Sequence, residues 1–175
     1  MSLEVLEPKF SEEVTNAILP NDAPDNVLFS VGSVLRGDDS VGPYVAKLFK
    51  EEPVEGWMLV EGDQTPENEL GYLRRLHPKR IVMIDAADMG LEAGSVRLIK
   101  KSDVSTSFLF TTHSMPITYL LGQLEVACDE LIFIGVQPAQ TEFFAPLTKS
   151  VKESAETIYE TLFKGGNFSE ISPLS

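Results

Sequence analysis

The sequence predicts an α/β fold, namely a three-layer α/β/α sandwich around a twisted, mostly parallel sheet of about five strands. Several short runs are apolar throughout, as strands buried on both faces are. The segments between them carry apolar residues at spacings of three and four, which is typical of amphipathic helices. Because the two kinds of segment alternate along 175 residues, helices should cover both faces of one sheet.

Five apolar runs are expected as strands. In chain order they are NVLFSV (26–31), WMLVEG (57–62), RIVMIDAAD (80–88), GSVRLIK (94–100) and ELIFIGVQP (130–138). The fourth run is expected near an edge of the sheet, and one strand is allowed to be antiparallel. The third run is the most convincing strand of the five.

Four helical stripes separate or follow these runs. Their apolar positions are Val41, Tyr44, Val45, Leu48 and Phe49; Leu70, Leu73 and Leu76; Ile117, Leu120, Leu121 and Leu124; and Val151, Ala155, Ile158, Tyr159 and Leu162. Thr65 followed by Pro66 reads as an N-cap and first helical residue. His77 and Pro78 should end that short helix, and a glycine pair at 165–166 should end the last one.

The predicted organisation is a single domain over residues 26–166, between an N-terminal extension and a C-terminal tail. Residues 1–25 are polar and acidic and end in PNDAP, a turn-rich break. We expect them to form a loose arm, or a short docking helix over residues 10–19. Residues 167–175 form the tail.

The composition excludes several classes of partner. A formal net charge of −13 disfavours nucleic acid and anionic membrane surfaces, but it suits a cation or a basic protein segment. No apolar run reaches the roughly 18 to 20 residues of a membrane span, and the N-terminus lacks a signal-peptide pattern. The single cysteine, Cys128, is expected as core filler. We therefore expect a cytoplasmic protein.

The turn VGSVLRGDDSVG, residues 31–42, carries the first functional signal. Gly32 and Gly37 have the spacing of a phosphate-binding loop, which continues with Lys and then Ser or Thr. Here the next residues are Asp38 and Asp39, which would repel a phosphate. The turn therefore favours a cation and argues against a nucleotide.

Further polar residues are expected at the same end of the sheet. Asp85 lies at the end of the third strand, and His113 lies in the loop before a helix. Two carboxylates and an imidazole suit a divalent transition ion with open positions, or a water molecule held for hydrolysis. Each residue also has a structural interpretation: Asp38 or Asp39 as a helix N-cap, Asp85 as a turn former, and His113 as a cap or packed polar residue.

Other catalytic patterns are absent from the sequence. It contains no G-x-S-x-G nucleophile elbow, no H-E-x-x-H zinc helix, and no G-x-G-x-x-G after a strand. Cys128 is distant in sequence from His113, which disfavours a Cys–His pair, and His77 is expected to be exposed in a loop.

Three segments together resemble the nickel-iron hydrogenase maturation endopeptidases. VGSVLRGDDSVGPYVAKLF is similar to their first motif, IVMIDAADMG to their second and TTHSMPITYLL to their third. The resemblance runs from about residue 27 to residue 163 and is strongest to the branch that processes the large subunit of hydrogenase 3. One departure is Ser33, where the family usually has Asn.

The resemblance implies an α/β/α fold and an endopeptidase that removes the C-terminal extension of a hydrogenase large-subunit precursor. The precursor would carry the nickel, and Asp39, Asp85 and His113 would bind that ion and take part in catalysis. The family is often classed with aspartic peptidases. No nucleotide cofactor, nucleic acid or membrane partner is implied.

Three other functions remain open from the sequence. The same residues would suit a non-catalytic nickel-binding assembly chaperone, and a related peptidase could process another protein. A nucleotide-binding α/β protein is disfavoured by Asp38 and Asp39.

Overall fold

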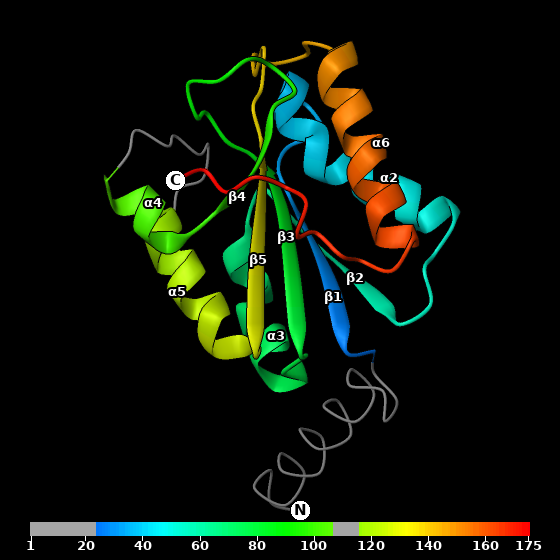
Figure 1. Cartoon of the computed structure of the whole chain (residues 1–175), viewed down its shortest axis with the longest axis vertical. Helices are drawn as coiled ribbons and strands as arrows, with labels where there is room; N and C mark the ends of the chain where they lie inside the picture. Colours follow the sequence, from blue (N-terminus) through cyan, green and yellow to red (C-terminus); the bar gives the residue numbers. More distant parts are fainter. Residues whose placement is uncertain (1–23, 107–115) are drawn as a thin grey trace, which may run out of the picture.

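The computed structural model describes residues 24–106 and 116–175, and it has a five-stranded sheet between two layers of helices (Figure 1). The α/β/α prediction is confirmed. The extension predicted for residues 1–25 lies almost entirely outside the described residues, and His113 lies outside them too.

The strands follow the predicted apolar runs closely. They are β1 (Asn26–Val31), β2 (Trp57–Asp63), β3 (Arg80–Ala86), β4 (Val96–Ile99) and β5 (Glu130–Val136). Their order is β2-β1-β3-β5-β4, with every pairing parallel except that of β4 with β5. The single antiparallel strand and the edge position of β4 are both as predicted.

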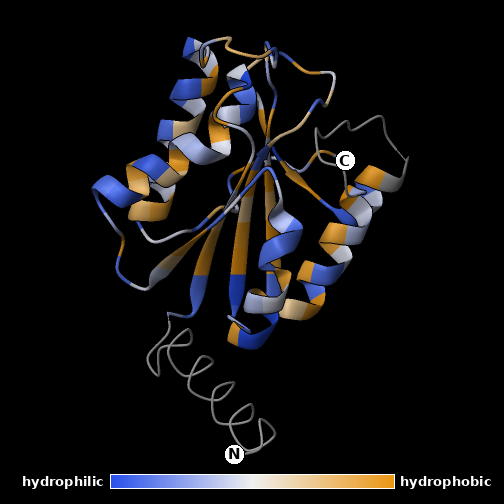
Figure 2. Cartoon of the chain, turned by 180° about the vertical axis from the view of Figure 1, so that it is seen from behind, coloured by the Kyte–Doolittle hydropathy of each residue, from blue (hydrophilic) through white to orange (hydrophobic). Residues whose placement is uncertain are grey.

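The helices pack in two layers. The helical segments are η2 (Gly37–Ser40), α2 (Val41–Glu51), η3 (Pro66–Glu69), α3 (Leu70–Leu76), α4 (Lys101–Thr106), α5 (Ile117–Ala127) and α6 (Lys149–Phe163). Helices α2 and α6 cover one face of the sheet, while α3 and α5 cover the other and α4 packs on α5. Figure 2 shows the apolar strands between these layers.

Alternate strand residues supply the two cores. On β1, Leu28 packs toward α2 and α6, whereas Val27 and Phe29 pack toward α3 and α5. On β3, Ile84 belongs to the first core and Met83 to the second. Both faces are therefore buried, because side chains of successive strand residues point to opposite faces.

Two local features differ from the sequence predictions. Thr65 occupies the N-cap position before Pro66, as predicted, but its side chain makes no capping bond to the backbone and instead accepts a hydrogen bond from Asn68 Nδ2 at 3.1 Å. Pro66 opens a 3₁₀ turn that leads into α3. Helix α4 was not predicted, because KSDVST has no apolar stripe; Asp103 accepts the backbone N–H of Lys100 at 2.8 Å and fixes its start.

Cys128 fills the core beside α5, as predicted. Its side chain is 6% exposed, and its Sγ lies 3.3 Å from the carbonyl of Leu124. Burial raises the pKa of this thiol above its ordinary value. A thiol that stays protonated is a poor nucleophile, which fits a packing role.

The chain crosses back over the sheet after α6. Phe168 is buried in the core under α2 and α6. The backbone N–H of Leu98 on β4 donates to the carbonyl of Ser172 at 3.0 Å, and the N–H of Leu174 donates to the carbonyl of Leu98 at 2.9 Å. The Ser175 hydroxyl donates to Asp103. Residues 167–175 are thus docked along β4.

In the described part of the chain, no helix is both long and apolar enough to cross a membrane.

The strand order places a topological switch point between β1 and β3, where open α/β sheets have their ligand-binding crevice. The chain passes from β1 to β2 on one side and then returns to β3 on the other side of β1. The connections leaving β1 and β3 therefore diverge at their carboxyl ends. In open α/β sheets, ligands bind at such a switch point.

Candidate active site at the carboxyl ends of β1 and β3

The turn after β1 holds Asp39 in place through backbone contacts. Gly32 adopts φ +134° and donates its N–H to the carbonyl of Asp63 at 2.8 Å. The next N–H, that of Ser33, donates to Asp39 Oδ2 at 2.9 Å, and Asp39 is 3% exposed. A β-carbon on Gly32 would lie 2.0 Å from the carbonyl oxygen of Asp39. The turn therefore requires glycine for both its φ angle and its close approach to Asp39.

Replacing Gly32 by alanine should destabilise the protein by at least about 2 kcal/mol, because a positive φ and a backbone clash combine. Urea unfolding measures this. Gly56→Ala is the matched control, since Gly56 also has a positive φ of 85° but has nothing within 4 Å of its added β-carbon. Equal losses in the two variants would contradict the role assigned to the contact with Asp39.

Asp85 lies at the same end of the sheet, near the end of β3. The parallel register pairs Ser30 with Ile84, so Asp85 lies one residue beyond, level with the end of β1. It is fully buried, and η2, which carries Asp39, contacts β3. The start of α2 packs closely against this end of β3, since a β-carbon on Gly42 would lie 2.8 Å from the carbonyl oxygen of Ile84. The carboxylate residues Asp39, on η2, and Asp85, on β3, therefore lie at the same end of the sheet, beside the switch point.

Asp38 has a different task from its neighbour. Its Oδ2 accepts the backbone N–H groups of Ala139 and Gln140 at 2.8 and 3.2 Å, and its Oδ1 accepts the N–H of Thr148 at 2.7 Å. The Thr148 hydroxyl lies 3.1 and 3.0 Å from the two oxygens. The carboxylate thus fastens both ends of the loop between β5 and α6. Neither Asp38 nor Asp39 is the N-cap of α2; Ser40 occupies that position.

The loop fastened by Asp38 presents aromatic side chains beside the turn. Phe143 and Phe144 are 57% and 83% exposed. The N–H of Phe144 donates to the carbonyl of Leu35 at 2.7 Å, and the Arg36 guanidinium lies 3.9 Å from the centre of the Phe143 ring. The two loops therefore form one continuous rim next to Asp39.

Gln137 organises the loop after β3, although it was not among the predicted site residues. Its Oε1 accepts the N–H groups of Met89 and Leu91 at 2.6 and 3.2 Å, while its Nε2 donates to Asp88 Oδ1 at 3.1 Å. Its position one residue past β5 was the available signal, because polar residues at that end of a parallel sheet tend to serve the site.

His77 is exposed at the other end of β3, as expected, with its Nε2 3.3 Å from Asp129.

The described residues supply the two carboxylates and no more of the predicted ligand set. Within residues 24–106 and 116–175, no group of three or more His, Cys, Asp or Glu side chains is placed to hold a metal ion. Helix α5 begins at Ile117, and β5 starts shortly after it ends, so α5 runs back from the carboxyl end of the sheet. The predicted third ligand, His113, precedes this helix and is not among the described residues.

Two buried carboxylates at a switch point can accept a proton from water or receive a cation. Comparison with known proteins decides to which class of protein the chain belongs. The sequence model of the hydrogenase maturation proteases matches residues 43–165. The chain belongs to this family. The hydrogenase 3 maturation protease of Escherichia coli K12 is 39% identical over 137 residues, which cover 78% of this chain and 88% of that protein.

Solved structures of this protease family agree with the assignment. A crystal structure of a hydrogenase 3 maturation protease superimposes with a TM-score of 0.81 at 37% identity, covering 87% of this chain and 98% of the other. The solution structure of an endopeptidase from E. coli gives 0.79 at 37% identity, covering 86% and 96%. The resemblance inferred from the three motifs is confirmed, and the chain is a peptidase of the hydrogenase maturation class.

Proposed function

We propose that this protease removes the C-terminal extension of a [NiFe]-hydrogenase large-subunit precursor after the precursor has received its nickel, and that it does so in the cytoplasm. The observation that supports the proposal is that Asp39 and Asp85 are both buried at the same end of the sheet, on η2 and β3, which contact each other. The net charge of −13 suits a substrate that presents a cation.

In this proposal the nickel arrives bound to the precursor and marks it as ready. Asp39 and Asp85 would contribute carboxylate oxygens and His113 an imidazole nitrogen to the open positions of the ion, which suits their donor types. The Ser33 N–H holds one oxygen of Asp39 and limits its rotation, so the carboxylate is oriented before substrate arrives. The bound ion would supply positive charge close to the scissile bond.

Hydrolysis requires one water molecule and one proton acceptor. A carboxylate of the pair takes a proton from water as the oxygen attacks the carbonyl carbon of the scissile peptide. The same proton then passes to the departing amide nitrogen, so the products are a new carboxylate on the mature subunit and a free amine on the extension. Closure of the crevice around the precursor would exclude other water.

The decisive test is incubation with nickel-loaded and nickel-free precursor from the same source, followed by mass spectrometry. We expect the C-terminal extension to be lost from the loaded form alone. Tight binding to the loaded form with both precursors intact would support the nickel-binding chaperone instead. Cleavage of both forms, or cleavage of an unrelated protein only, would overturn the dependence on nickel.

A further inference from the structure

A groove of about 740 Å³ lies next to the carboxylate crevice and outside it. Gly32, Val34 and Ser40 line the part formed by the turn after β1, and the groove continues along the outer face of α2. Its volume is in the range of about 300–1,000 Å³ that is usual for ligand sites. The catalytic carboxylates do not line it, so it needs an explanation of its own.

The groove gathers positive charge in a strongly acidic protein. Lys47 and Lys50 from α2 and Lys152 from α6 line it, against the carboxylates of Glu61 and Asp63 from β2. Lys50 Nζ is already paired with Glu61 at 2.6 Å. The contacts of the other two lysines therefore decide what the groove can bind.

The ammonium groups of Lys152 and Lys47 are held by weak contacts only and remain available to bind an anion. Lys152 forms no ion pair in the described part of the chain, and its Nζ lies 6.0 Å from the centre of the Tyr44 ring. Lys47 has only a contact at 4.0 Å with Glu51, and both of these side chains are more than 60% exposed. Such exposed pairs contribute little and exchange readily. Apolar side chains of Val34, Pro43 and Leu147 complete the walls.

We propose that this groove binds a carboxylate-bearing part of the precursor's C-terminal extension, with Lys47 and Lys152 as its anion contacts. The inference rests on the proposed function, because the groove begins at the turn that holds Asp39 and a chain held there can continue along α2. The extension ends in an α-carboxylate and can also carry acidic side chains. Its apolar side chains would contact the walls, and the lysines would fix its register for cleavage.

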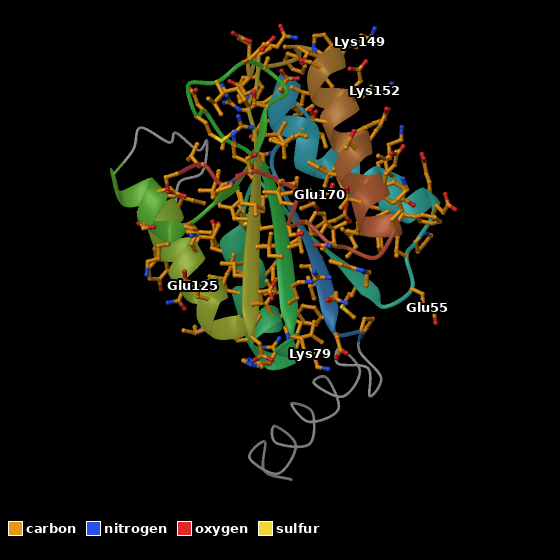
Figure 3. The ribbon with its side chains drawn as sticks, viewed as in Figure 1. Glu55, Lys79, Glu125, Lys149, Lys152 and Glu170 are labelled. Carbon is orange, nitrogen blue, oxygen red and sulfur yellow. The ribbon has the colours of Figure 1, made fainter. Side chains whose placement is uncertain are left out.

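The test combines Lys47→Glu with Lys152→Glu in one variant. Lys149→Glu is the matched control: Lys149 lies on the same first turn of α6 but outside the groove and is 90% exposed (Figure 3). Binding of a labelled extension peptide is measured by fluorescence anisotropy at about 0.15 M salt, where longer-range charge effects are screened. We expect the double variant to weaken binding at least about tenfold and to raise KM for precursor cleavage with little change in kcat.

Three forms of the peptide distinguish the source of the carboxylate. Weaker wild-type binding of the C-terminal amide assigns the α-carboxylate, and weaker binding of a peptide with Asn and Gln in place of its acids assigns the side chains. Equal binding of all three forms, or an unchanged Kd in the double variant, overturns the proposal. Because peptide binding needs neither nickel nor cleavage, it is read separately from the cleavage test of the proposed function.

Discussion

Cleavage of nickel-loaded precursor should fall by at least about 10²- to 10³-fold when either Asp39 or Asp85 is replaced by asparagine. Asparagine keeps the size of the side chain at both positions. In Asp39→Asn, its carbonyl oxygen can still accept the Ser33 N–H. It removes the negative charge and most of the basicity, which are the properties that the proposed chemistry uses. The loss should appear in kcat/KM, measured by mass spectrometry of the precursor over time.

Asp88→Asn is the matched control for these two variants. Asp88 follows β3 three residues after Asp85, but it is exposed and accepts hydrogen bonds from Gln137 and Gly90. This variant should cleave at close to the wild-type rate, and thermal unfolding should confirm that all three variants are folded. Full activity of Asp39→Asn would remove Asp39 from the catalytic assignment. For His113, the family resemblance of the sequence predicts that its replacement lowers kcat/KM as much as Asp85→Asn does.

Replacing Asp38 by alanine should cost about 3–5 kcal/mol of stability, because its buried carboxylate anchors both ends of the loop between β5 and α6. The change leaves three backbone N–H groups, those of Ala139, Gln140 and Thr148, without their acceptor. The loop between β5 and α6 should then open, and limited proteolysis should cut near Phe143 and Phe144, which are already exposed. Urea unfolding gives the energy and peptide mapping gives the position.

The comparison that isolates this effect is Asp88→Ala. That carboxylate also accepts two hydrogen bonds, but it is exposed, so water can replace it and the loss should stay below about 1 kcal/mol. A similarly small loss in Asp38→Ala, or cleavage of the loop at the wild-type rate, would show that other contacts hold the loop.

The strands, the helices and their three layers follow from short-range patterns, and that is why they could be predicted, whereas the strand order depends on pairing between distant segments and was not. The run at 80–88 was the most convincing strand in the sequence, and it forms β3, whose place in the middle of the sheet became visible only in the structure. The pair Asp38 and Asp39 looked alike in sequence, where either could cap a helix. What separates them is contact with Thr148, 110 residues away, and no local pattern contains that information.

The same reasoning explains what the sequence analysis missed around the site. The second strand was expected to end at Gly62, so Asp63 was not considered, although it lies at the same end of the sheet as Asp39 and Asp85 and lines the groove. The lysines that line the groove were not identified as binding residues from the sequence, for another reason. Lys47 and Lys50 occupy the outer face of α2, opposite its buried stripe, and exposed lysines on such a face are ordinary until a groove is seen beside them.

The docking of residues 167–175 along β4 has a consequence for the behaviour of the protein in a crowded cell. An outermost strand offers unpaired backbone groups to any other chain that arrives in extended form, which is a common start of aggregation. Residues 172–174 already form hydrogen bonds with the backbone N–H and carbonyl of Leu98, so these two groups are not open to another chain. This pairing leaves fewer backbone groups of β4 open to a second extended chain.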